Sequence, residues 1–412
     1  MAQKLKFGNG TWATKEGSTL AYNDENNNYK PLPFTTTRDS IATRVNKEGL
    51  IEVVGNDVPR IDYTDSADGV LLLEPQSTNL ITHSSELTNS SWVKTNTGTG
   101  SAPSITSNYS ISPDGTQNAD RVIFNLNGGT ANGDISQVSV TIGSVSSASY
   151  TNSVYIKSNT ANNYDLVVTD PSGGHIVKNI STEWQRFDNP RENVTNASFR
   201  IRLRGDEGTS DYADVSIWGA QLEQQSFVTS LINTSGSTVQ RAAETASGAG
   251  NSEVFNDSEG VLFAEINLIY NQSGRYITLG DGTSSNRIIL GTEGGDDRII
   301  FYVIVGGNVQ CQIPYILPDI NAIYKIAIKY KQNDFALWVN GLEVGTDTSG
   351  STLASNALSK LVFNGGTGTS NFYGKTKELG YYNTALTDAE LEYMTSYRSL
   401  NELVTELNLN EL

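Results

Sequence analysis

Strict alternation of apolar and charged residues is the feature that most constrains this chain. In residues 198–204, Phe199, Ile201 and Leu203 fall on one face of an extended strand, and the arginines between them fall on the other. Similar stretches recur roughly every ten to twenty residues over residues 79–244, with Gly, Asn and Asp between them. An antiparallel sandwich buries one face of many short strands at once, so this spacing predicts an all-β domain.

The composition supports turn-rich β structure and argues against several classes of function. The 412 residues include 38 glycines, and only 37% are hydrophobic and 18% charged. With 28 Lys and Arg against 45 Asp and Glu, the net charge of −17 repels nucleic acid and anionic lipid. One cysteine and two histidines allow no intrachain disulfide and no cysteine-based zinc site, and leave little imidazole for acid–base chemistry.

No stretch of the sequence has the pattern of a membrane span or a secretory signal. The longest apolar run, Ile299–Val305, is far shorter than the roughly 18 residues that a crossing helix needs. The first residues, Met1–Lys6, contain no apolar segment. We therefore expect no membrane insertion.

The pattern divides the chain into four parts. Residues 1–78 are irregular and have too little apolar material for a core of their own, so we expect the next domain or a partner chain to order them. Residues 79–250 form the alternating domain, and its small-residue end, 246–250, is typical of a linker. A second β-rich domain spans residues 251–398. The tail, 399–412, carries leucines at heptad-like spacing, so it packs locally or joins copies of the chain.

Two local signals in the second β-rich domain are especially clear. Asn340-Gly341 between two apolar runs predicts a hairpin with a type I′ turn. Thr387 and Glu390 form a capping box, which predicts the start of a helix.

Several short motifs resemble bacteriophage virion fibre proteins. In the first 80 residues the resemblance rests on Trp12–Glu16, Leu20–Glu25, Lys30–Phe34, Ala42–Glu52, Pro59–Tyr63 and Leu72–Leu80. Residues 217–223 and 239–244 are similar to the end of a carbohydrate-binding-module-like jelly roll in those proteins. Leu337–Gly341 and Glu378–Leu391 resemble the concanavalin A-like, or laminin G-like, lectin fold.

The resemblance implies an all-β, non-enzymatic virion protein with two antiparallel β-sandwich (jelly-roll) domains after an irregular N-terminal segment. Residues 1–78 would attach it to capsid or tail proteins and support oligomerisation, with a homotrimer expected. The protein would be made in the host bacterial cytoplasm, be exposed on the virion surface, and bind host-surface glycans for adsorption. The alternative is a purely structural capsid-decoration or fibre-shaft protein without a ligand of its own.

A sugar site needs an aromatic face for stacking and polar groups for the hydroxyls. In the strand expected at 335–339, Trp338 faces away from the apolar residues on either side of it, so we expect it to point outward near the turn. The candidate carbohydrate-binding residues are Trp338, Asn340, Arg287, Asn371 and Tyr373.

The other rare side chains are expected to be structural. Trp92, Trp184 and Trp218 lie within strand patterns and are expected in a core. Cys311 lies between polar residues with no histidine near it in sequence, so we expect a semi-buried thiol and not a nucleophile.

Catalytic and metal sites have little support. Glycosidases of the concanavalin A-like fold use a strand that carries paired carboxylates. The nearest candidate has Glu265, but Asn267 and Ile269 occupy the following same-face positions. We expect no cofactor; acidic turns at 280–282 and 294–297 leave calcium as an alternative.

Overall fold

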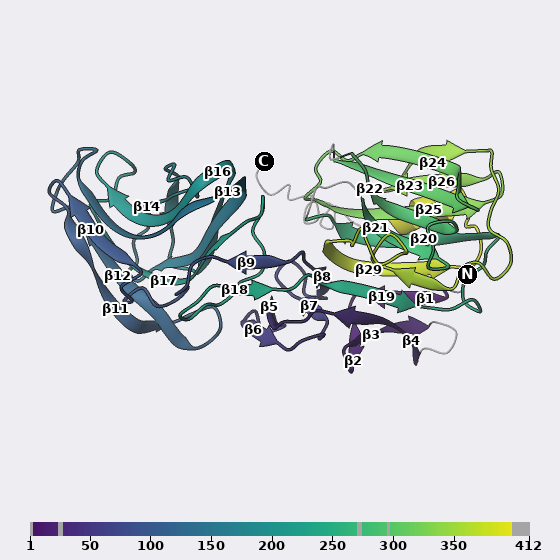
Figure 1. The fold of residues 1–412 in the computed structure, drawn as a ribbon, viewed down its shortest axis with the longest axis horizontal. Helices are drawn as coiled ribbons and strands as arrows, with labels where there is room; N and C mark the ends of the chain where they lie inside the picture. Colours follow the sequence, from purple (N-terminus) through teal and green to yellow (C-terminus); the bar gives the residue numbers. More distant parts are fainter. Residues whose placement is uncertain (1–2, 24–27, 270–273, 295–296, 398–412) are drawn as a thin grey trace. The chain divides into compact units, whose positions relative to one another are not determined.

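The fold is all-β, as expected. The computed structural model describes residues 3–23, 28–269, 274–294 and 297–397. Its named strands pair antiparallel, and α1 (Asp388–Thr395) is the one helix in the described part of the chain (Figure 1). No helical segment there has the length and apolar character needed to cross a membrane.

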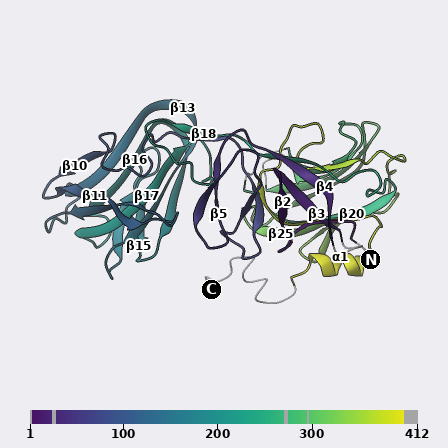
Figure 2. The same ribbon diagram turned by 90° about the horizontal axis from the view of Figure 1, so that it is seen from below.

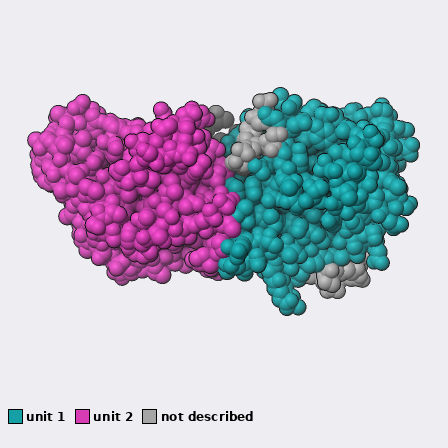
Figure 3. All heavy atoms as spheres, viewed as in Figure 1, with its two compact units in different colours: residues 1–39, 54–75, 243–412 teal, residues 40–53, 76–242 magenta. Residues whose placement is uncertain are grey.

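The chain forms two compact units, which Figure 3 colours separately. Unit 1 contains Met1–Asp39, Val54–Pro75 and Ala243–Leu412. Unit 2 contains Ser40–Val53 and Gln76–Ala242.

This division corrects the expected domain boundaries. Residues 1–78 are shared between the two units, and the second boundary lies at Ala242–Ala243 instead of residue 250. The supposed linker lies largely in β19 (Thr245–Ala249), where Ala246 and Ala249 are fully buried, because small side chains let this strand pack closely. The 399–412 tail and its leucines lie outside the described residues, and an attachment role for residues 1–78 stays a prediction.

Unit 1 packs two layers of strands over one hydrophobic core. The first layer runs in the order β27 (Leu342–Asp347), β26 (Phe335–Val339), β25 (Ile323–Lys331), β20 (Glu259–Asn267) and β29 (Gly374–Tyr382). The second runs β24 (Asn308–Ile316), β23 (Arg298–Val305), β22 (Arg287–Thr292), β21 (Arg275–Gly280), β28 (Lys360–Val362) and β19.

Strands from the N-terminal part of the chain complete both layers of unit 1. These strands are β1 (Leu5–Gly8), β2 (Ala13–Lys15), β3 (Ser18–Asn23), β4 (Asn28–Thr37), β7 (Arg60–Asp62) and β8 (Val70–Leu73). β1 and β8 pair with β29, and β4 pairs with β19. Because β1 also pairs with β3 and β3 with β4, these strands link the layers and cover their edges.

Both local signals in unit 1 are confirmed. Asn340 and Gly341 have φ of 49° and 83°, as a type I′ turn requires, and they join β26 to β27. Glu390 accepts a hydrogen bond from the Thr387 backbone N–H at 2.9 Å, which caps α1. The helix packs on the outer side of the β25 layer (Figure 2).

Unit 2 is an antiparallel sandwich around its own core. Its main strands are β10 (Val93–Thr97), β11 (Ser101–Ile111), β12 (Gln117–Asn125), β13 (Ile135–Ser158), β14 (Tyr164–Val168), β15 (Val177–Ile180), β16 (Gln185–Arg204) and β17 (Tyr212–Glu223). They pair in the order β11-β12-β17-β13-β16-β14-β15, with β10 on β13. Two small pairs are β5 (Ala42–Val45) with β6 (Ile51–Val54), and β9 (Ser77–Asn79) with β18 (Val239–Arg241).

The alternation that defined this domain is confirmed in β16. Phe199, Ile201 and Leu203 are fully buried in the core of unit 2. Trp92 and Trp218 are buried as expected, whereas Trp184 is half-buried.

A buried ionic cluster lies in unit 1, and its four members come from three separate parts of the sequence. Arg38, Arg60, Glu74 and Glu244 are each at most 3% exposed. Arg38 Nη1 donates to Glu244 Oε1 at 2.7 Å, and Arg60 Nη2 donates to Glu74 Oε2 at 2.8 Å. The two positive and two negative charges balance, which is how a core accommodates ionised groups.

Candidate functional site

A polar hollow of about 280 Å³ opens on the outer face of the second layer of unit 1. Leu361 and Phe363 pack into the core. Lys360, Val362 and Asn364 alternate with them and therefore face outward, where they line the hollow. Its remaining wall comes from β19, from Gly282 and from the glycine-rich loop that follows β28.

Lys360 supplies the positive charge of the hollow. None of the ion pairs found among the described residues includes Lys360. Gly282 has φ of +91°, a backbone conformation that favours glycine, and the Lys360 ammonium group lies directly beside this turn. The charge is therefore available to a ligand.

Asn364 is a buried polar side chain in the wall of the hollow, only 4% exposed. Its Oδ1 accepts from the Gly366 N–H at 2.8 Å, and its backbone oxygen accepts from Thr278 Oγ1 at 2.6 Å. These bonds fix the shape of the glycine-rich loop. With Oδ1 engaged, the Nδ2 group is the part of the amide that can donate to a ligand.

Hydrogen bonds of Arg287 and Asp281 hold the loop and the turn beside the hollow in place. Arg287 Nη1 donates to the Gly365 oxygen at 2.6 Å, which ties the glycine-rich loop to β22. Asp281 accepts from the N–H and Oγ1 of Thr283, both at 2.7 Å, and from Asn286 Nδ2 at 2.9 Å. Burial tends to raise the pKa of Asp281, but these hydrogen bonds outweigh it and lower the pKa.

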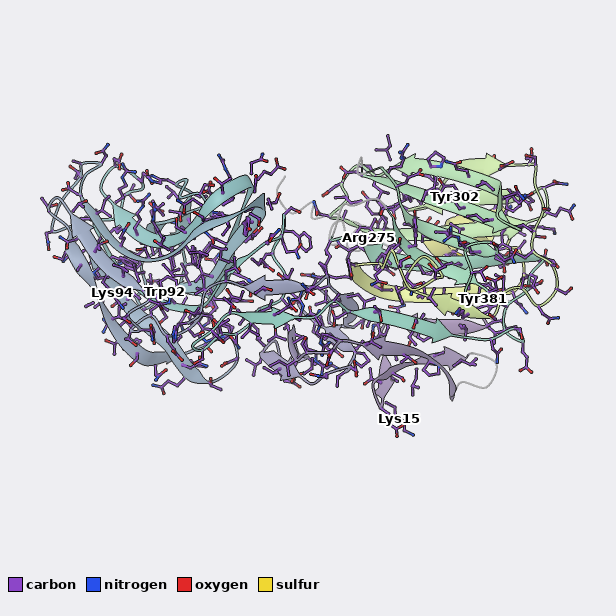
Figure 4. The ribbon with its side chains drawn as sticks, in the orientation of Figure 1. Lys15, Trp92, Lys94, Arg275, Tyr302 and Tyr381 are labelled. Atoms are coloured by element: carbon purple, nitrogen blue, oxygen red, sulfur yellow. The ribbon has the colours of Figure 1, made fainter. Side chains whose placement is uncertain are left out.

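Tyr302 lies on the same outer face of the second layer, two strands away from β21. Thr278 lies opposite Ile289 in β22, and Ile289 lies opposite Tyr302 in β23, so the three side chains share one side of the sheet. Tyr302 Oη donates to Glu293 Oε1 at 2.7 Å. Burial and the Glu293 carboxylate raise the pKa of Tyr302 to about 12, so its hydroxyl stays protonated. Figure 4 labels Tyr302 and Arg275 in this layer.

The structure corrects the prediction that Trp338 is an exposed stacking platform. Trp338 does face away from the main core, but it is only 6% exposed. It packs with Ala327 beneath Leu386 and Leu391, which belong to α1 and the turn before it. A ring covered in this way cannot stack on a sugar. No local pattern indicates that the helix folds back onto this strand.

The other four predicted carbohydrate-binding residues lie in different elements of unit 1. Asn340 accepts from the Lys325 N–H at 2.9 Å and serves the hairpin turn. Asn371 and Tyr373 follow the glycine-rich loop. Tyr373 is only 7% exposed and has the Arg275 Cζ 5.1 Å from the centre of its ring, so, like Trp338, it is not an open stacking platform. Of the predicted set, Arg287 contacts the loop that lines the hollow; binding by Asn340, Asn371 or Arg287 stays a prediction.

Lys360 and Asn364 were not found from the sequence. The signal that marks them is the run Lys360–Asn364, in which both polar residues fall on the face opposite Leu361 and Phe363, followed directly by Gly365-Gly366. A strand that ends in a glycine pair places its last polar side chain beside a loop that approaches closely.

The candidate residues for catalysis and metal binding have structural partners. Glu265 is 4% exposed and lies 3.1 Å from Lys377 Nζ. No group of three or more His, Cys, Asp or Glu suited to a metal ion occurs among the described residues. Part of the 294–297 turn lies outside them, and calcium binding stays a prediction. Cys311 is 1% exposed, more buried than expected, and burial raises the pKa of its thiol to about 12.

Comparison with known proteins identifies the fold of this region. Residues 249–392 match the Laminin_G_3 family model, described as the concanavalin A-like lectin/glucanases superfamily. These residues therefore form a lectin-type β-sandwich. A comparison with curated proteins finds no match.

Three solved structures illustrate the similarity. Domain 4 of the arabinanase AbnA from Geobacillus stearothermophilus is 14% identical, with a TM-score of 0.30, over 37% of this chain and 73% of that chain. The CBM40 of the Ruminococcus gnavus IT-sialidase is 15% identical, with a TM-score of 0.31, over 36% and 94%. A pentraxin from Limulus polyphemus is 16% identical, with a TM-score of 0.28, over 34% and 71%. At these values the likenesses carry no conclusion about ligands.

Proposed function

We propose that the protein binds glycans through the polar hollow of unit 1, and that it does so as a virion fibre protein that attaches a bacteriophage to its host. One observation carries the glycan proposal. Lys360 and the nearly buried Asn364 line a hollow on the outer face of a lectin-type sandwich. The virion role is supported by the sequence motifs that resemble fibre proteins, chiefly those in the first 80 residues.

The chemistry of the hollow suits a saccharide. Sugar hydroxyls need donors and acceptors in fixed positions, because each one gives up water on binding. The Asn364 amide is fixed by the bond from the Gly366 N–H, and the Lys360 ammonium can donate three hydrogen bonds. The exposed Thr367 adds a hydroxyl at the rim. A site fixed before binding loses little entropy when the ligand arrives.

The proposal also covers the protein's mode of action, location and assembly. The protein acts by binding and not by catalysis, takes no cofactor, and is exposed on the virion after synthesis in the host bacterial cytoplasm. It assembles as a homotrimer and attaches to capsid or tail proteins through N-terminal residues. Three copies of a weak site gain avidity when they engage one surface together.

The test is a glycan array probed with the full chain and with two variants of the hollow. Lys360→Met removes the ammonium group but keeps the length of the side chain. Asn364→Asp keeps an oxygen to accept from Gly366 but removes the Nδ2 donor. We expect each variant to lose about tenfold in affinity for the glycans that bind the wild type, because each loses a hydrogen bond in the wall of the site.

Lys15→Met is the matched control. Lys15 is exposed in β2, also in unit 1, and its replacement removes the same charge (Figure 4). This variant should bind like the wild type. If no glycan binds any form of the chain, the glycan proposal fails and the structural decoration or shaft role remains. Release of reducing sugar from a bound glycan would overturn the non-enzymatic assignment.

A further inference from the structure

Two cationic side chains at the hollow of unit 1 have no carboxylate partner in the described part of the chain. Lys360 lines the hollow directly. Arg287 lies beside its wall: Nη1 donates to the Gly365 oxygen, and Cδ is 3.9 Å from the position that a Cβ on Gly366 would take. The Arg287 Nε is buried without a hydrogen-bond partner among the described residues. Neither positive charge is therefore neutralised by an ion pair.

The acidic residue of the adjoining turn is occupied within that turn. Asp281 precedes Gly282, which lines the hollow. Asp281 Oδ1 accepts from Thr283 Oγ1 at 2.7 Å, and Oδ2 accepts from Asn286 Nδ2 at 2.9 Å. Among the described residues that line the hollow, none is Asp or Glu. The hollow is thus a locally positive site on a chain whose net charge is −17.

The overall negative charge does not oppose an anionic ligand at this position. Charges farther apart than about 8 Å are largely screened at physiological ionic strength. A small ligand in the hollow therefore interacts mainly with Lys360 and much less with distant acidic side chains. A long polyanion lying across the surface would meet many carboxylates at once.

The wall of the hollow offers no ring for stacking. The described residues that line it are small, polar or aliphatic, and none is aromatic. A neutral sugar that cannot stack on an aromatic face has to be held by hydrogen bonds to its hydroxyls. Hydrogen bonds between ionised groups are roughly twice as strong as those between neutral groups. A saccharide that brings a negative charge for Lys360 makes better use of this wall than a neutral one does.

The hollow has a charged end and a neutral end. The Phe363 N–H donates to the Ala246 oxygen at 2.9 Å, so the run from Lys360 to Asn364 stays extended beyond β28. At about 3.3 Å per residue, the Cα atoms of Lys360 and Asn364 are about 13 Å apart. Val362 lies between them and is 3% exposed. A ligand that contacts both ends is therefore longer than a single sugar ring.

We infer, on the basis of the function proposed above, that the saccharide bound in the hollow is acidic. Its carboxylate or sulfate group binds the Lys360 ammonium, and the hydroxyls of a neighbouring sugar bind the Asn364 amide. Lysine offers three donors around a point charge, which suits the oxygens of either anionic group. Because only one end of the hollow is charged, the ligand binds in one direction along the strand.

The experiment titrates the full chain with matched pairs of oligosaccharides. One pair is an oligouronate and its carboxyl-reduced form, and the other is a sulfated oligosaccharide and its desulfated form. We expect the wild type to bind the charged member of at least one pair about tenfold more tightly than the neutral member. The pair that shows this preference distinguishes carboxylate from sulfate.

Variants of Lys360 test where the negative charge binds. Lys360→Met should bind the charged and the neutral member equally, whereas Lys360→Arg keeps the positive charge and should keep most of the preference. Lys15→Met, the exposed control, should keep all of it. Thermal unfolding checks that every variant is folded.

The outcomes separate this inference from the function proposed for the hollow. If the wild type binds both members of each pair equally, and Lys360→Met and Asn364→Asp weaken both, the inference is wrong while glycan binding by the hollow stands. If Lys360→Met keeps the full preference for the charged member, the anionic group binds elsewhere and the inference is also wrong. If no saccharide binds the chain, both proposals fail.

Discussion

Arg60 and Glu244 form a two-point ion pair in the interior of unit 1, although 184 positions separate them in the sequence. Arg60 Nε donates to Glu244 Oε1 at 2.9 Å, and neither side chain is exposed. Burial alone would lower the pKa of Arg60, but the charges of Glu244 and Glu74 raise it above its ordinary value. The pair joins an N-terminal strand to the residue just before β19, so it couples the beginning of the chain to the lectin-type sandwich.

Loss of Arg60 should destabilise unit 1 strongly. In Arg60→Met the carboxylates of Glu74 and Glu244 stay buried without their main partner, which costs about 3–5 kcal/mol. Urea denaturation measures the change in the free energy of unfolding. Arg44→Met is the comparison, because the Arg44–Glu52 pair is partly exposed, at 25% and 37%, and should change stability by less than about 1 kcal/mol. Equal effects of the two substitutions would contradict this account of the cluster.

Trp338 should matter for stability and not for glycan binding. Trp338→Ala leaves a cavity beneath α1 and should cost about 3–5 kcal/mol of unfolding free energy. Trp338→Phe should cost less, because it fills more of the space and removes an indole N–H that is buried without a hydrogen-bond partner. Urea denaturation and the glycan array are the two measurements. Weaker glycan binding by a folded Trp338→Phe chain would restore the stacking role predicted from the sequence.

The stability of unit 2 should fall in acid in a way that depends on Asp214. Hydrogen bonds from Arg121 and Asn159 hold the pKa of Asp214 below its ordinary value of 3.8. The carboxylate therefore stabilises the folded state at any pH above that value, and this contribution is lost as the pH falls through the lowered pKa. Asp214→Asn should be less stable than the wild type at pH 7 and 5, with a smaller difference at pH 3.

Urea denaturation at those three pH values measures the dependence on Asp214. The exposed Asp211, changed to Asn, is the control and should give a small difference throughout. If the difference in unfolding free energy between Asp214→Asn and the wild type grows as the pH falls, the predicted direction of the pH dependence is wrong.

A fragment of residues 251–412 should not fold on its own. It lacks β1 and β8, which pair with β29, and it lacks β19, which pairs with β28. Without these strands, the edges of β29 and β28 would be left unpaired. The core residues Phe7 and Phe34 would also be missing from the sandwich. Circular dichroism and thermal unfolding of the fragment test this. A cooperative transition like that of unit 1 in the full chain would mean that the N-terminal strands are dispensable.

Features encoded by neighbouring residues were predictable from the sequence. The inward Phe199, Ile201 and Leu203 follow from two-residue periodicity, and the turn at Asn340 follows from the conformations that Asn and Gly tolerate. The helix at Thr387 follows from its capping box. Each of these depends on contacts within a few residues, so no knowledge of the tertiary fold is needed.

Features that depend on distant partners were not predictable. Ala246 and Ala249 suggested a linker because nothing near them shows that β4 and β28 lie on either side. Trp338 was expected on the outside because the helix that covers it begins fifty residues later in the sequence. Lys360 and Asn364 gain their significance only from the turn at Gly282 and the loop that closes around them. Such sites require the topology of the sheet, which local patterns do not specify.

Calorimetric titration of the full chain measures glycan binding by the hollow of unit 1. The titrant is an oligosaccharide selected on the array, and the proteins are the wild type, Lys360→Met, Asn364→Asp and the control Lys15→Met. We expect a dissociation constant about tenfold higher for each variant of the hollow, and an unchanged one for Lys15→Met. Equal dissociation constants for all four proteins would contradict the claim that the hollow of unit 1 binds glycans.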